Sequence, residues 1–230
     1  VINFSEQISQ LSAQSFVQQL LVHRLNAKAV WVGDDFRFGI GRSGDFAQMQ
    51  QLGVEYGFSV AQTPTLIRYD RRISSTWIRE ALSEGNMSLA EELLGSCYRI
   101  YGRVMHGQKL GRQLGFPTMN IHLRHPLAVS GVFAVSVIGL DNQPLYGVAN
   151  LGVRPSVMGA HQQKLEVHLF DWQGYAYGKK IEVVFHHRLR SEQHFDSLEQ
   201  LTQQIHQDVK QSRDWWHKKA SLNEAIPYAR

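Results

Sequence analysis

The chain has 230 residues, of which 43% are hydrophobic and 19% are charged, and its formal net charge is +4. This apolar content supports a packed core, and no stretch approaches the roughly 20 consecutive apolar residues of a membrane-spanning helix, so we expect a soluble globular protein. The basic residues are scattered rather than gathered into runs, which argues against a nucleic-acid-binding tail and suits small anionic ligands.

Helical and strand patterns alternate along the first part of the chain. Apolar residues recur at helical spacing between Ser12 and Leu25, and residues 29–32 then form a short run typical of a buried strand. Further helices are expected at residues 47–52, 77–82 and 89–94, and a second strand at residues 58–60. Alternating helices and strands predict an α/β layer with a parallel sheet.

After Tyr98 the pattern changes to short strands separated by Gly, Asn, Asp and Pro. The strands are expected at residues 132–138, 145–149, 165–170 and 181–185. This all-β pattern places a domain boundary near residue 96, which gives an N-terminal domain of residues 1–95 and a C-terminal domain of residues 96–222.

A helix is expected to follow the β segment. Ser197 can cap its start, and Gln200 stands where it completes a capping box. The apolar positions of this helix make one stripe, which is expected to close one side of a barrel: Leu198, Leu201, Ile205 and Val209.

A glycine-rich run is the most informative segment of the C-terminal part. Gly107, Gly111 and Gly115 stand four residues apart and allow the backbone to approach a phosphate chain, while Lys109 and Arg112 add positive charge. The run is not a P-loop, because the order GxxxxGK[ST] is missing. An ATP-binding segment is the functional interpretation, and an ordinary glycine-rich loop leading into a strand is the alternative.

The residues that follow this run suit a metal ion. Pro117 favours extended geometry, and in an extended segment Thr118 and Asn120 point to the same face. A hydroxyl and an amide oxygen on one protein edge suit Mg²⁺, which keeps water and substrate phosphates in its other positions.

A polar pair alternates with apolar residues in the segment 165–171. Glu166 and His168 therefore share one face of a strand, and Glu166 can take a proton from an attacking hydroxyl. A solvated strand glutamate without a catalytic role is the alternative.

The N-terminal part carries two further candidate segments. Residues 33–39 follow a strand at its carboxyl end, where open α/β sheets bind ligands. The hydroxyls of Ser74, Ser75 and Thr76 stand at a helix start with Arg79 one turn on, which suits a triphosphate. Simple helix capping is the alternative for the hydroxyls.

Several runs together resemble one family. They are GRQLGFPTMNI from residue 111, GVFAV from 131, GVANLGVRPS from 147, LEVHLFDW from 165, YGKKIEVVF from 177 and LRSEQHFDSLEQLTQQIHQD from 189. In this order they are similar to the riboflavin kinase module of bacterial bifunctional riboflavin kinase/FMN adenylyltransferases, over residues 96–213. The resemblance implies an antiparallel β-barrel riboflavin kinase domain with a C-terminal helix.

The resemblance also implies roles for particular residues. In that family the Pro-Thr-x-Asn segment supplies the Mg²⁺ ligands and the glutamate of the E-x-H-x-F-D strand is the base, which carries over to Thr118, Asn120 and Glu166. The family's flavin contacts carry over to the Arg-x-Glu-x-x-Phe stretch: Arg190, Glu192 and Phe195.

Residues 32–45 and 73–82 resemble two motifs of the FMN adenylyltransferase domain of the same enzymes, which implies a nucleotidyltransferase-like (Rossmann-like) partial domain. Asp35 and Phe36 are then expected to contact flavin, and the hydroxyl segment with Arg79 to contact ATP. The family's opening glycine- and histidine-rich segment is absent from these 230 residues. We expect weak or lost adenylyl transfer if they are the whole protein, and a bifunctional parent if they are part of a longer one.

The sequence therefore predicts a riboflavin kinase that converts ATP and riboflavin to ADP and FMN, with Mg²⁺ as cofactor. Its expected partners are riboflavin, FMN and ATP, with no nucleic acid and no membrane, in a monomer or weak oligomer. The single Cys97 cannot form an internal disulfide and no signal-like segment is seen, so a cytoplasmic location is expected. A non-catalytic flavin- or nucleotide-binding barrel is the alternative function, and the presence of Glu166 argues against it.

Overall fold

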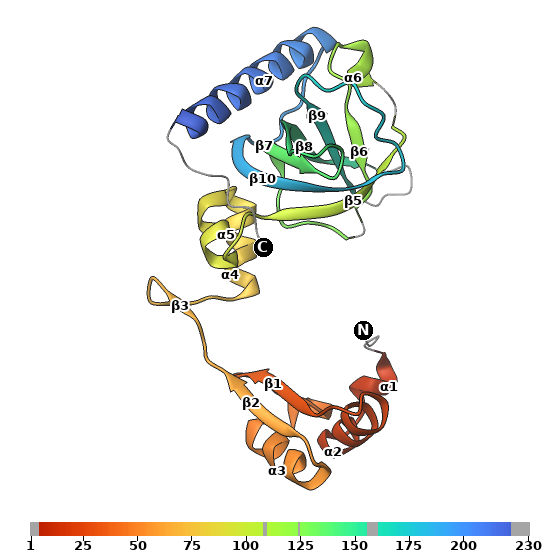
Figure 1. Cartoon of the computed structure of the whole chain (residues 1–230), viewed down its shortest axis with the longest axis vertical. Coiled ribbons are helices and arrows are strands. Elements are labelled where there is room, and N and C mark those ends of the chain that lie inside the picture. The colour runs from red at the N-terminus through yellow and green to blue at the C-terminus, as the bar shows by residue number, and fades with distance from the viewer. Residues whose placement is uncertain (1–4, 108–109, 124, 156–160, 222–230) are drawn as a thin grey trace. The chain divides into compact units, whose positions relative to one another are not determined.

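The computed structural model describes residues 5–107, 110–123, 125–155 and 161–221. The chain divides into two compact units, residues 1–73 and residues 74–230. Figure 1 shows the helices and strands of each unit.

The first unit contains a small parallel sheet with helices. Its elements are α1 (Glu6–Ser9), α2 (Ala13–Phe16), η1 (Val17–Arg24), β1 (Ala29–Gly33), η2 (Ile40–Arg42), α3 (Phe46–Tyr56), β2 (Ser59–Thr63), β3 (Ile67–Arg68) and β4 (Arg71–Arg72). Strand β1 pairs with β2 in parallel, from Ala29 opposite Ser59 to Gly33 opposite Thr63. The predicted parallel α/β layer is confirmed.

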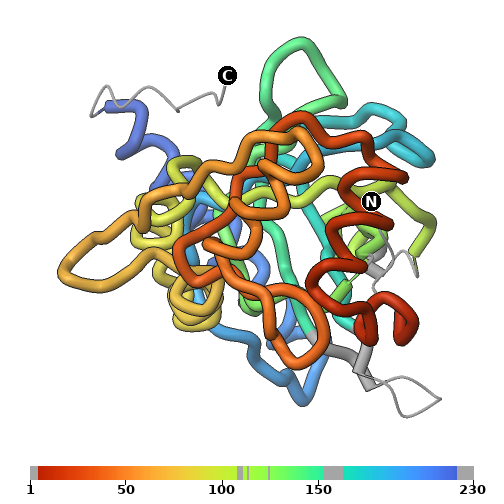
Figure 2. Tube along the Cα trace, turned by 90° about the horizontal axis from the view of Figure 1, so that it is seen from below, coloured from red at the N-terminus to blue at the C-terminus, as the bar shows by residue number. Residues whose placement is uncertain are grey.

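The first long helix of this unit changes its winding along its length. Ser12 caps α2 by accepting a hydrogen bond from the backbone amide of Ser15, and the chain then continues as the π-helix η1. The two elements follow one another as a red coil in Figure 2. Val17, the first residue of η1, is fully buried and packs with Phe38 and Met49 in the core of this unit.

Three successive helices share the same start and stop signals. Helices α4 (Ser75–Glu84) and α5 (Met87–Leu94) begin the second unit and follow the pattern of α3. The side chains that cap their starts accept a backbone hydrogen bond from the residue three positions on: Asp45, Ser74 and Asn86. The residues after their ends are glycines with positive φ, a conformation that other residues adopt at a cost: Gly57, Gly85 and Gly95.

The second unit is built on a closed antiparallel barrel. Its strands are β5 (Arg99–Met105), β6 (Met119–Ile121), β7 (Gly131–Ile138), β8 (Leu145–Pro155), β9 (His161–Leu169) and β10 (Lys180–Arg190), and a short helix, α6 (Leu110–Gln113), precedes β6. The strands close in the order β10, β5, β6, β9, β8, β7. The predicted β-barrel is confirmed, although β5 and β6 were not predicted as strands.

Alternating apolar residues fill the barrel and extend its core to two helices. Phe133 and Phe185 are almost fully buried and meet edge to face, with ring centroids 5.3 Å apart. Ala81 of α4 and Ala90 of α5 belong to the same buried cluster. The two helices therefore pack with the barrel, and the boundary near residue 96 stays a prediction.

Helix α7 (Leu198–Ser221) lies along one side of the barrel and packs on β7, β8 and β10 (Figure 1). Its start is capped by Ser197, whose Oγ accepts a hydrogen bond from the Gln200 amide at 3.2 Å. The Gln200 side chain accepts from the amide of Asp196, one residue before the capping-box position. The helix buries Asp208 and Ser212 most deeply. Its predicted apolar stripe lines a cavity instead of closing the barrel, because the strands close the barrel themselves.

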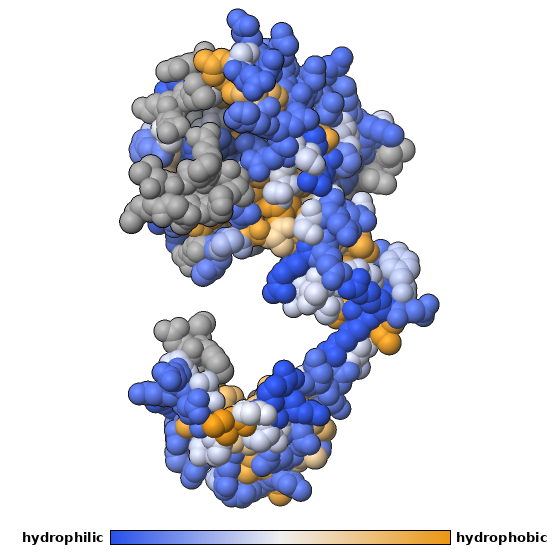
Figure 3. Space-filling model, turned by 180° about the vertical axis from the view of Figure 1, so that it is seen from behind, coloured by the Kyte–Doolittle hydropathy of each residue, from blue (hydrophilic) through white to orange (hydrophobic). Residues whose placement is uncertain are grey.

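The face of the molecule seen in Figure 3 is mostly hydrophilic, with small apolar patches. Among the residues that the structure describes, no helix is both long and apolar enough to cross a membrane.

A buried polar cluster lies under the end of α7. His186 Nε2 lies 2.9 Å from the hydroxyl of Ser136, and its Nδ1 lies 3.8 Å from the sulfur of Cys97. The Trp216 ring packs against the same imidazole in a T-shaped arrangement, with centroids 4.8 Å apart. Burial, with smaller contributions from the charges of Lys219 and Arg99, lowers the pKa of His186 to about 3. The imidazole is therefore neutral in the folded protein.

This cluster predicts acid sensitivity. In the unfolded chain His186 titrates near its ordinary pKa of 6.5, whereas the folded chain takes up this proton only near about 3. Between these values the unfolded state binds more protons than the folded state. The free energy of unfolding therefore decreases as the pH is lowered through this window, by up to roughly 1.4 kcal/mol per pH unit. Urea unfolding across this window should show that His186→Gln flattens the dependence. Parallel pH profiles for parent and variant would contradict the assignment to His186.

Candidate functional site

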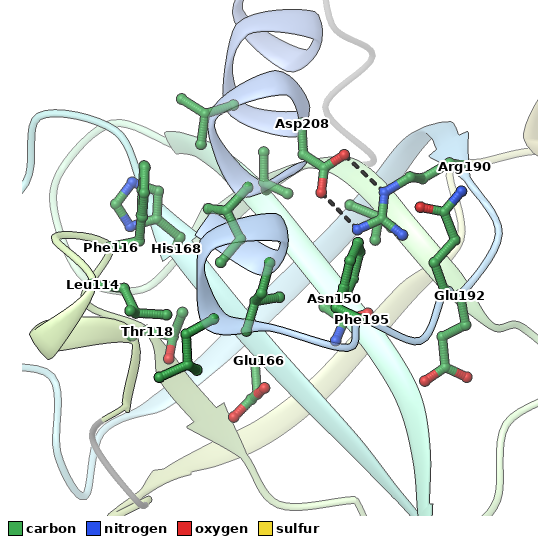
Figure 4. A pocket seen from close by; sticks show the side chains of 18 of the residues that line it. Leu114, Phe116, Thr118, Asn150, Glu166, His168, Arg190, Glu192, Phe195 and Asp208 are labelled. Carbon is green, nitrogen blue, oxygen red and sulfur yellow. Dashed lines mark hydrogen bonds and ion pairs between the residues drawn. The ribbon is translucent and has the colours of Figure 1, made fainter. Parts of the chain in front are cut away.

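The larger cavity of the barrel unit lies between the outer face of β7 to β9, the segment after β10, and α7. Its volume is about 540 Å³, within the size range of small-molecule sites. Leu165 and Val167 of β9 point into the barrel core. Glu166 and His168 alternate with them, so they point to the opposite face of the strand and line this cavity. Figure 4 shows Glu166 below the first turns of α7.

Three polar residues form a row across neighbouring strands beside this cavity. In the strand ladders Asn120 of β6 and Asn150 of β8 both stand opposite Glu166 of β9. Side chains directly opposite each other in antiparallel strands are close neighbours. The structure therefore brings together two of the predicted residues and adds Asn150. The sequence does not single out Asn150, because its place beside Glu166 depends on the strand register.

Glu166 also has a cationic neighbour that sequence reasoning missed. The ammonium of Lys164, two residues earlier on the same strand face, lies 2.6 Å from a carboxylate oxygen of Glu166. The two side chains are 26% and 22% exposed, so the pair is partly shielded from water. The ammonium of Lys164 therefore compensates the negative charge of the Glu166 carboxylate at the edge of the cavity.

The predicted metal ligands show an unsatisfied oxygen. Asn120 Oδ1 is buried without a hydrogen-bond partner among the described residues. The backbone at Gly107 lies against the Asn120 amide so closely that a β-carbon there would collide with it. A buried acceptor without a partner is costly unless a cation or a ligand satisfies it. The donor set of Asn120 and the Thr118 hydroxyl fits Mg²⁺.

A second cavity, of about 280 Å³, lies on the other side of residues 116–120, which contain the predicted metal ligands and are named the metal segment. Thr118 lines both cavities. The second cavity is lined by Arg112 and by the aromatic side chains of Trp172, Tyr175 and Tyr177. The Tyr177 ring stacks on the imidazole of His106. A planar ring such as a nucleobase fits among aromatic side chains of this kind.

The glycine-rich run packs tightly against the metal segment. A β-carbon at Gly111 would collide with the carbonyl oxygen of Phe116 and would lie 3.2 Å from the Thr118 hydroxyl. Gly115 has φ of 84°, a left-handed conformation that favours glycine. Lys109 lies outside the described residues, so its predicted contact with phosphate stays a prediction.

The predicted flavin residues, at the end of β10 and in the segment after it, differ in what they contact. Arg190 donates from Nε and Nη2 to the two carboxylate oxygens of Asp208, each at 2.8 Å (Figure 4). The same guanidinium lies over the ring of Phe195, 5.7 Å from its centroid. Glu192 reaches back to the barrel, where its carboxylate fills the space that a side chain at Gly152 would take. All three predicted residues line the larger cavity.

Asp208 is a residue that sequence reasoning missed. It is only 3% exposed, and it also accepts a hydrogen bond from the Gln204 side chain at 3.0 Å. It stands beside the apolar stripe of α7, where an acidic residue carries no signal of its own. The sequence does not show that Asp208 pairs with Arg190, because this contact depends on how α7 packs against the end of β10.

The hydroxyl segment of α4 makes local contacts. Ser74 caps the helix by accepting from the Trp77 amide at 3.2 Å, as the capping alternative expects. Arg79 Nη1 donates to the Ser75 hydroxyl at 3.3 Å, and Thr76 is exposed. These contacts leave the predicted triphosphate role untested.

The candidate residues of the first unit lie after β1. Arg72 Nη2 lies 3.0 Å from carboxylate oxygens of both Asp34 and Asp35. A hydrogen bond from Thr65, followed by the charge of Arg72, lowers the pKa of Asp34. Phe36 stacks on Phe38 and packs against the core of this unit. The predicted flavin contacts of Asp35 and Phe36 stay predictions.

An aromatic contact ties the metal segment to two other elements. The ring of Phe116 meets His168 of β9 and His206 of α7 edge-on, with centroids 5.5 Å and 4.7 Å apart. His168 Nδ1 lies 3.0 Å from the carbonyl oxygen of Pro117. Burial lowers the pKa of His168, which outweighs the opposite effect of this hydrogen bond.

Two family models match the chain. A model described as riboflavin kinase matches residues 94–216, and one described as FAD synthetase matches residues 1–77. The first covers the barrel and most of α7, and the second covers the first unit and the start of α4.

Curated relatives match over most of the chain. A bifunctional riboflavin kinase/FMN adenylyltransferase of Escherichia coli (strain K12) is 49% identical over 216 residues, which are 94% of this chain and 69% of the relative. A protein of the same name from Pseudomonas fluorescens is 48% identical over 91% of this chain and 68% of the relative.

A crystal structure described as a macrolide-efflux protein from Streptococcus pneumoniae has a TM-score of 0.73 and 30% identity, over 93% of this chain and 68% of that chain. With the barrel, the two cavities and the relatives, these matches agree with the resemblance seen in the motifs. The chain belongs to the bifunctional riboflavin kinase/FMN adenylyltransferase family and contains its riboflavin kinase domain.

Proposed function

We propose that the barrel unit transfers the γ-phosphate of ATP to the terminal hydroxyl of riboflavin, with Glu166 as general base and a Mg²⁺ ion on Thr118 and Asn120. The observation that carries this proposal is the position of Thr118, which lines both cavities. The larger cavity contains Glu166 and suits the flavin, and the smaller one is lined by aromatic side chains and suits the nucleotide.

In this mechanism Glu166 accepts the proton of the terminal ribityl hydroxyl as the hydroxyl oxygen forms a bond to the γ-phosphorus. The bond from the γ-phosphorus to the bridging oxygen breaks, and ADP leaves. Lys164 balances the charge of Glu166 before the reaction. The Gly111 segment brings backbone close to the phosphates, and Arg112 at the second cavity adds charge. A bound Mg²⁺ would neutralise the negative charge of the β- and γ-phosphates.

The flavin would lie under α7. Leu201 and Ile205 offer apolar contact for its ring system, and Phe195 offers an aromatic face. Asn150 can donate to and accept from hydroxyls of the ribityl chain, because it stands next to Glu166 in the strand ladder. The pair of Arg190 and Asp208 would hold this side of the cavity together.

We also propose the remaining features expected from the sequence. FMN adenylyl transfer, with ATP at Ser74, Ser75, Thr76 and Arg79, is supported by the FAD synthetase match to residues 1–77, which includes the three hydroxyl residues. A domain boundary near residue 96 is compatible with the start of the riboflavin kinase match at residue 94. A cytoplasmic monomer or weak oligomer that binds no nucleic acid suits an enzyme of small molecules.

The proposal is tested by incubating the purified chain with riboflavin and ATP, with Mg²⁺ or with excess chelator, and separating riboflavin, FMN and FAD by chromatography. FMN that forms only with Mg²⁺ is the expected result, and FAD beside it would support adenylyl transfer. A folded chain that binds riboflavin but forms no FMN with Mg²⁺ would favour the non-catalytic flavin-binding barrel.

A further inference from the structure

We propose that His168 is a positioning residue, which fixes the metal-binding segment in register with the catalytic base. The inference rests on the proposed roles of Thr118 and Glu166. His168 Nδ1 lies 3.0 Å from the carbonyl oxygen of Pro117, the residue directly before Thr118. One side chain of β9 thus holds the segment on which the metal ligand stands.

The position of His168 on β9 makes this link direct. His168 is two residues after Glu166, so both side chains point to the same face of the strand and line the larger cavity. The ladder between β6 and β9 pairs Met119 with Val167, and β6 begins only at Met119. Pro117 and Thr118 therefore precede the strand and have no partner in this ladder. The hydrogen bond from the His168 side chain links them to β9 instead.

Packing around Phe116 also holds this segment, through His168 of β9 and His206 of α7. Phe116 is 8% exposed, and its ring contacts His168 and His206 edge-on, at interplanar angles of 82° and 80°. Figure 4 shows the rings of Phe116 and His168 against one another, beside Leu114 and Thr118. The imidazole of His168 thus has two functions that can be separated: its Nδ1 donates a hydrogen bond to the carbonyl oxygen of Pro117, and its ring packs against Phe116.

The hydrogen bond requires a proton on Nδ1, because the carbonyl oxygen of Pro117 can only accept. The neutral Nδ1–H tautomer provides this proton, and burial disfavours the charged form. An asparagine side chain places its amide nitrogen at about the distance from Cα at which Nδ1 stands in histidine. His168→Asn can therefore keep the donor while it removes most of the ring, and His168→Leu keeps bulk while it removes the donor.

The experiment compares the parent with these two variants in FMN formation and in the binding of ADP with Mg²⁺ by calorimetry. For His168→Leu we expect kcat to fall by about 10- to 100-fold, because a misplacement of about 1 Å can cost 10²-fold. We expect the affinity for ADP with Mg²⁺ to fall by about tenfold. Riboflavin affinity, followed by flavin fluorescence, should fall less, because the other residues that line the larger cavity remain in place. His168→Asn should return kcat to within about threefold of the parent.

Two outcomes overturn the inference. The first is a His168→Leu variant with parental kcat and parental affinity for ADP with Mg²⁺. The second is a His168→Asn variant as impaired as His168→Leu, which would mean that the ring packing matters and the hydrogen bond does not. Phe116→Leu, which disturbs the packing alone, and thermal unfolding of all variants separate these cases from a folding defect.

The binding measurement keeps this inference distinct from the proposed function. If the parent forms no FMN, the proposed reaction fails, and the affinity for ADP with Mg²⁺ still decides whether His168 positions the metal segment. If the parent is active and Glu166→Gln is not, unchanged behaviour of His168→Leu overturns the positioning role alone.

Discussion

Glu166→Gln is expected to reduce kcat for FMN formation by about 10²- to 10⁴-fold, the range in which a general base contributes. The amide keeps the shape and one acceptor oxygen of the carboxylate, but it replaces the other oxygen by a donor and cannot take the proton of the ribityl hydroxyl. Riboflavin binding should change little, because the walls of the larger cavity remain in place. Initial rates of FMN formation and flavin fluorescence titrations measure the two quantities.

Glu182→Gln is the matched control for this change. Glu182 lies on β10, where it pairs with Arg99 at 2.8 Å, and it does not line the larger cavity. This control should keep kcat close to that of the parent, because Glu182 lines neither the larger cavity nor the second one. Equal activity of Glu166→Gln and the parent would remove Glu166 from the mechanism, whereas loss of riboflavin binding in Glu166→Gln would make it a binding residue.

Asp208→Ala is expected to lower the free energy of unfolding by about 3 to 5 kcal/mol, because it leaves the partly buried guanidinium of Arg190 without its carboxylate. The side chains of Asp208 and Arg190 are 5% and 16% exposed, and their two hydrogen bonds measure 2.8 Å each. The KM for riboflavin should rise, because the Arg190 guanidinium packs on the Phe195 ring in the wall of the cavity. Without Asp208 to fix Arg190, this part of the wall is expected to shift. Urea unfolding and riboflavin titration provide the two measurements.

The exposed pair of Asp171 and Arg213 provides the comparison for this change. Their side chains are 78% and 40% exposed, and their charged atoms approach to 2.9 Å. Asp171→Ala should cost no more than about 1 kcal/mol, as is usual for surface pairs. An Asp208→Ala variant as stable as Asp171→Ala would show that the buried pair does not hold α7 and the end of β10 together.

Regular alternation made much of the fold predictable. Leu165, Val167 and Leu169 enter the core, as their period of two indicates. The strands predicted at residues 29–32 and 58–60 correspond to the parallel pair β1 and β2, although β2 begins at Ser59 and runs on to Thr63. The strands β5 and β6 escaped prediction for different reasons. Strand β5 is interrupted by Gly102, and β6 has only three residues directly after the glycine-rich run.

The candidate site was predictable only in part, because much of it depends on long-range pairing. Glu166, Thr118 and Asn120 stand in motifs that chemistry and family resemblance single out, and the ladder places Asn120 opposite Glu166. The contacts of Asp208 depend instead on how α7 packs, and the place of Asn150 depends on the register of β8 against β9. A sequence pattern contains neither kind of information.

The most direct test of the central claim is a crystal structure of the chain with Mg²⁺, ADP and FMN. We expect a Mg²⁺ ion about 2.0 to 2.1 Å from the Thr118 hydroxyl and from Asn120 Oδ1, in the geometry usual for this ion. We also expect the ester oxygen of FMN within roughly 3.2 Å of the Glu166 carboxylate, the distance for proton transfer. A metal ion bound elsewhere, or FMN with its phosphate directed away from Glu166, would contradict the proposed mechanism.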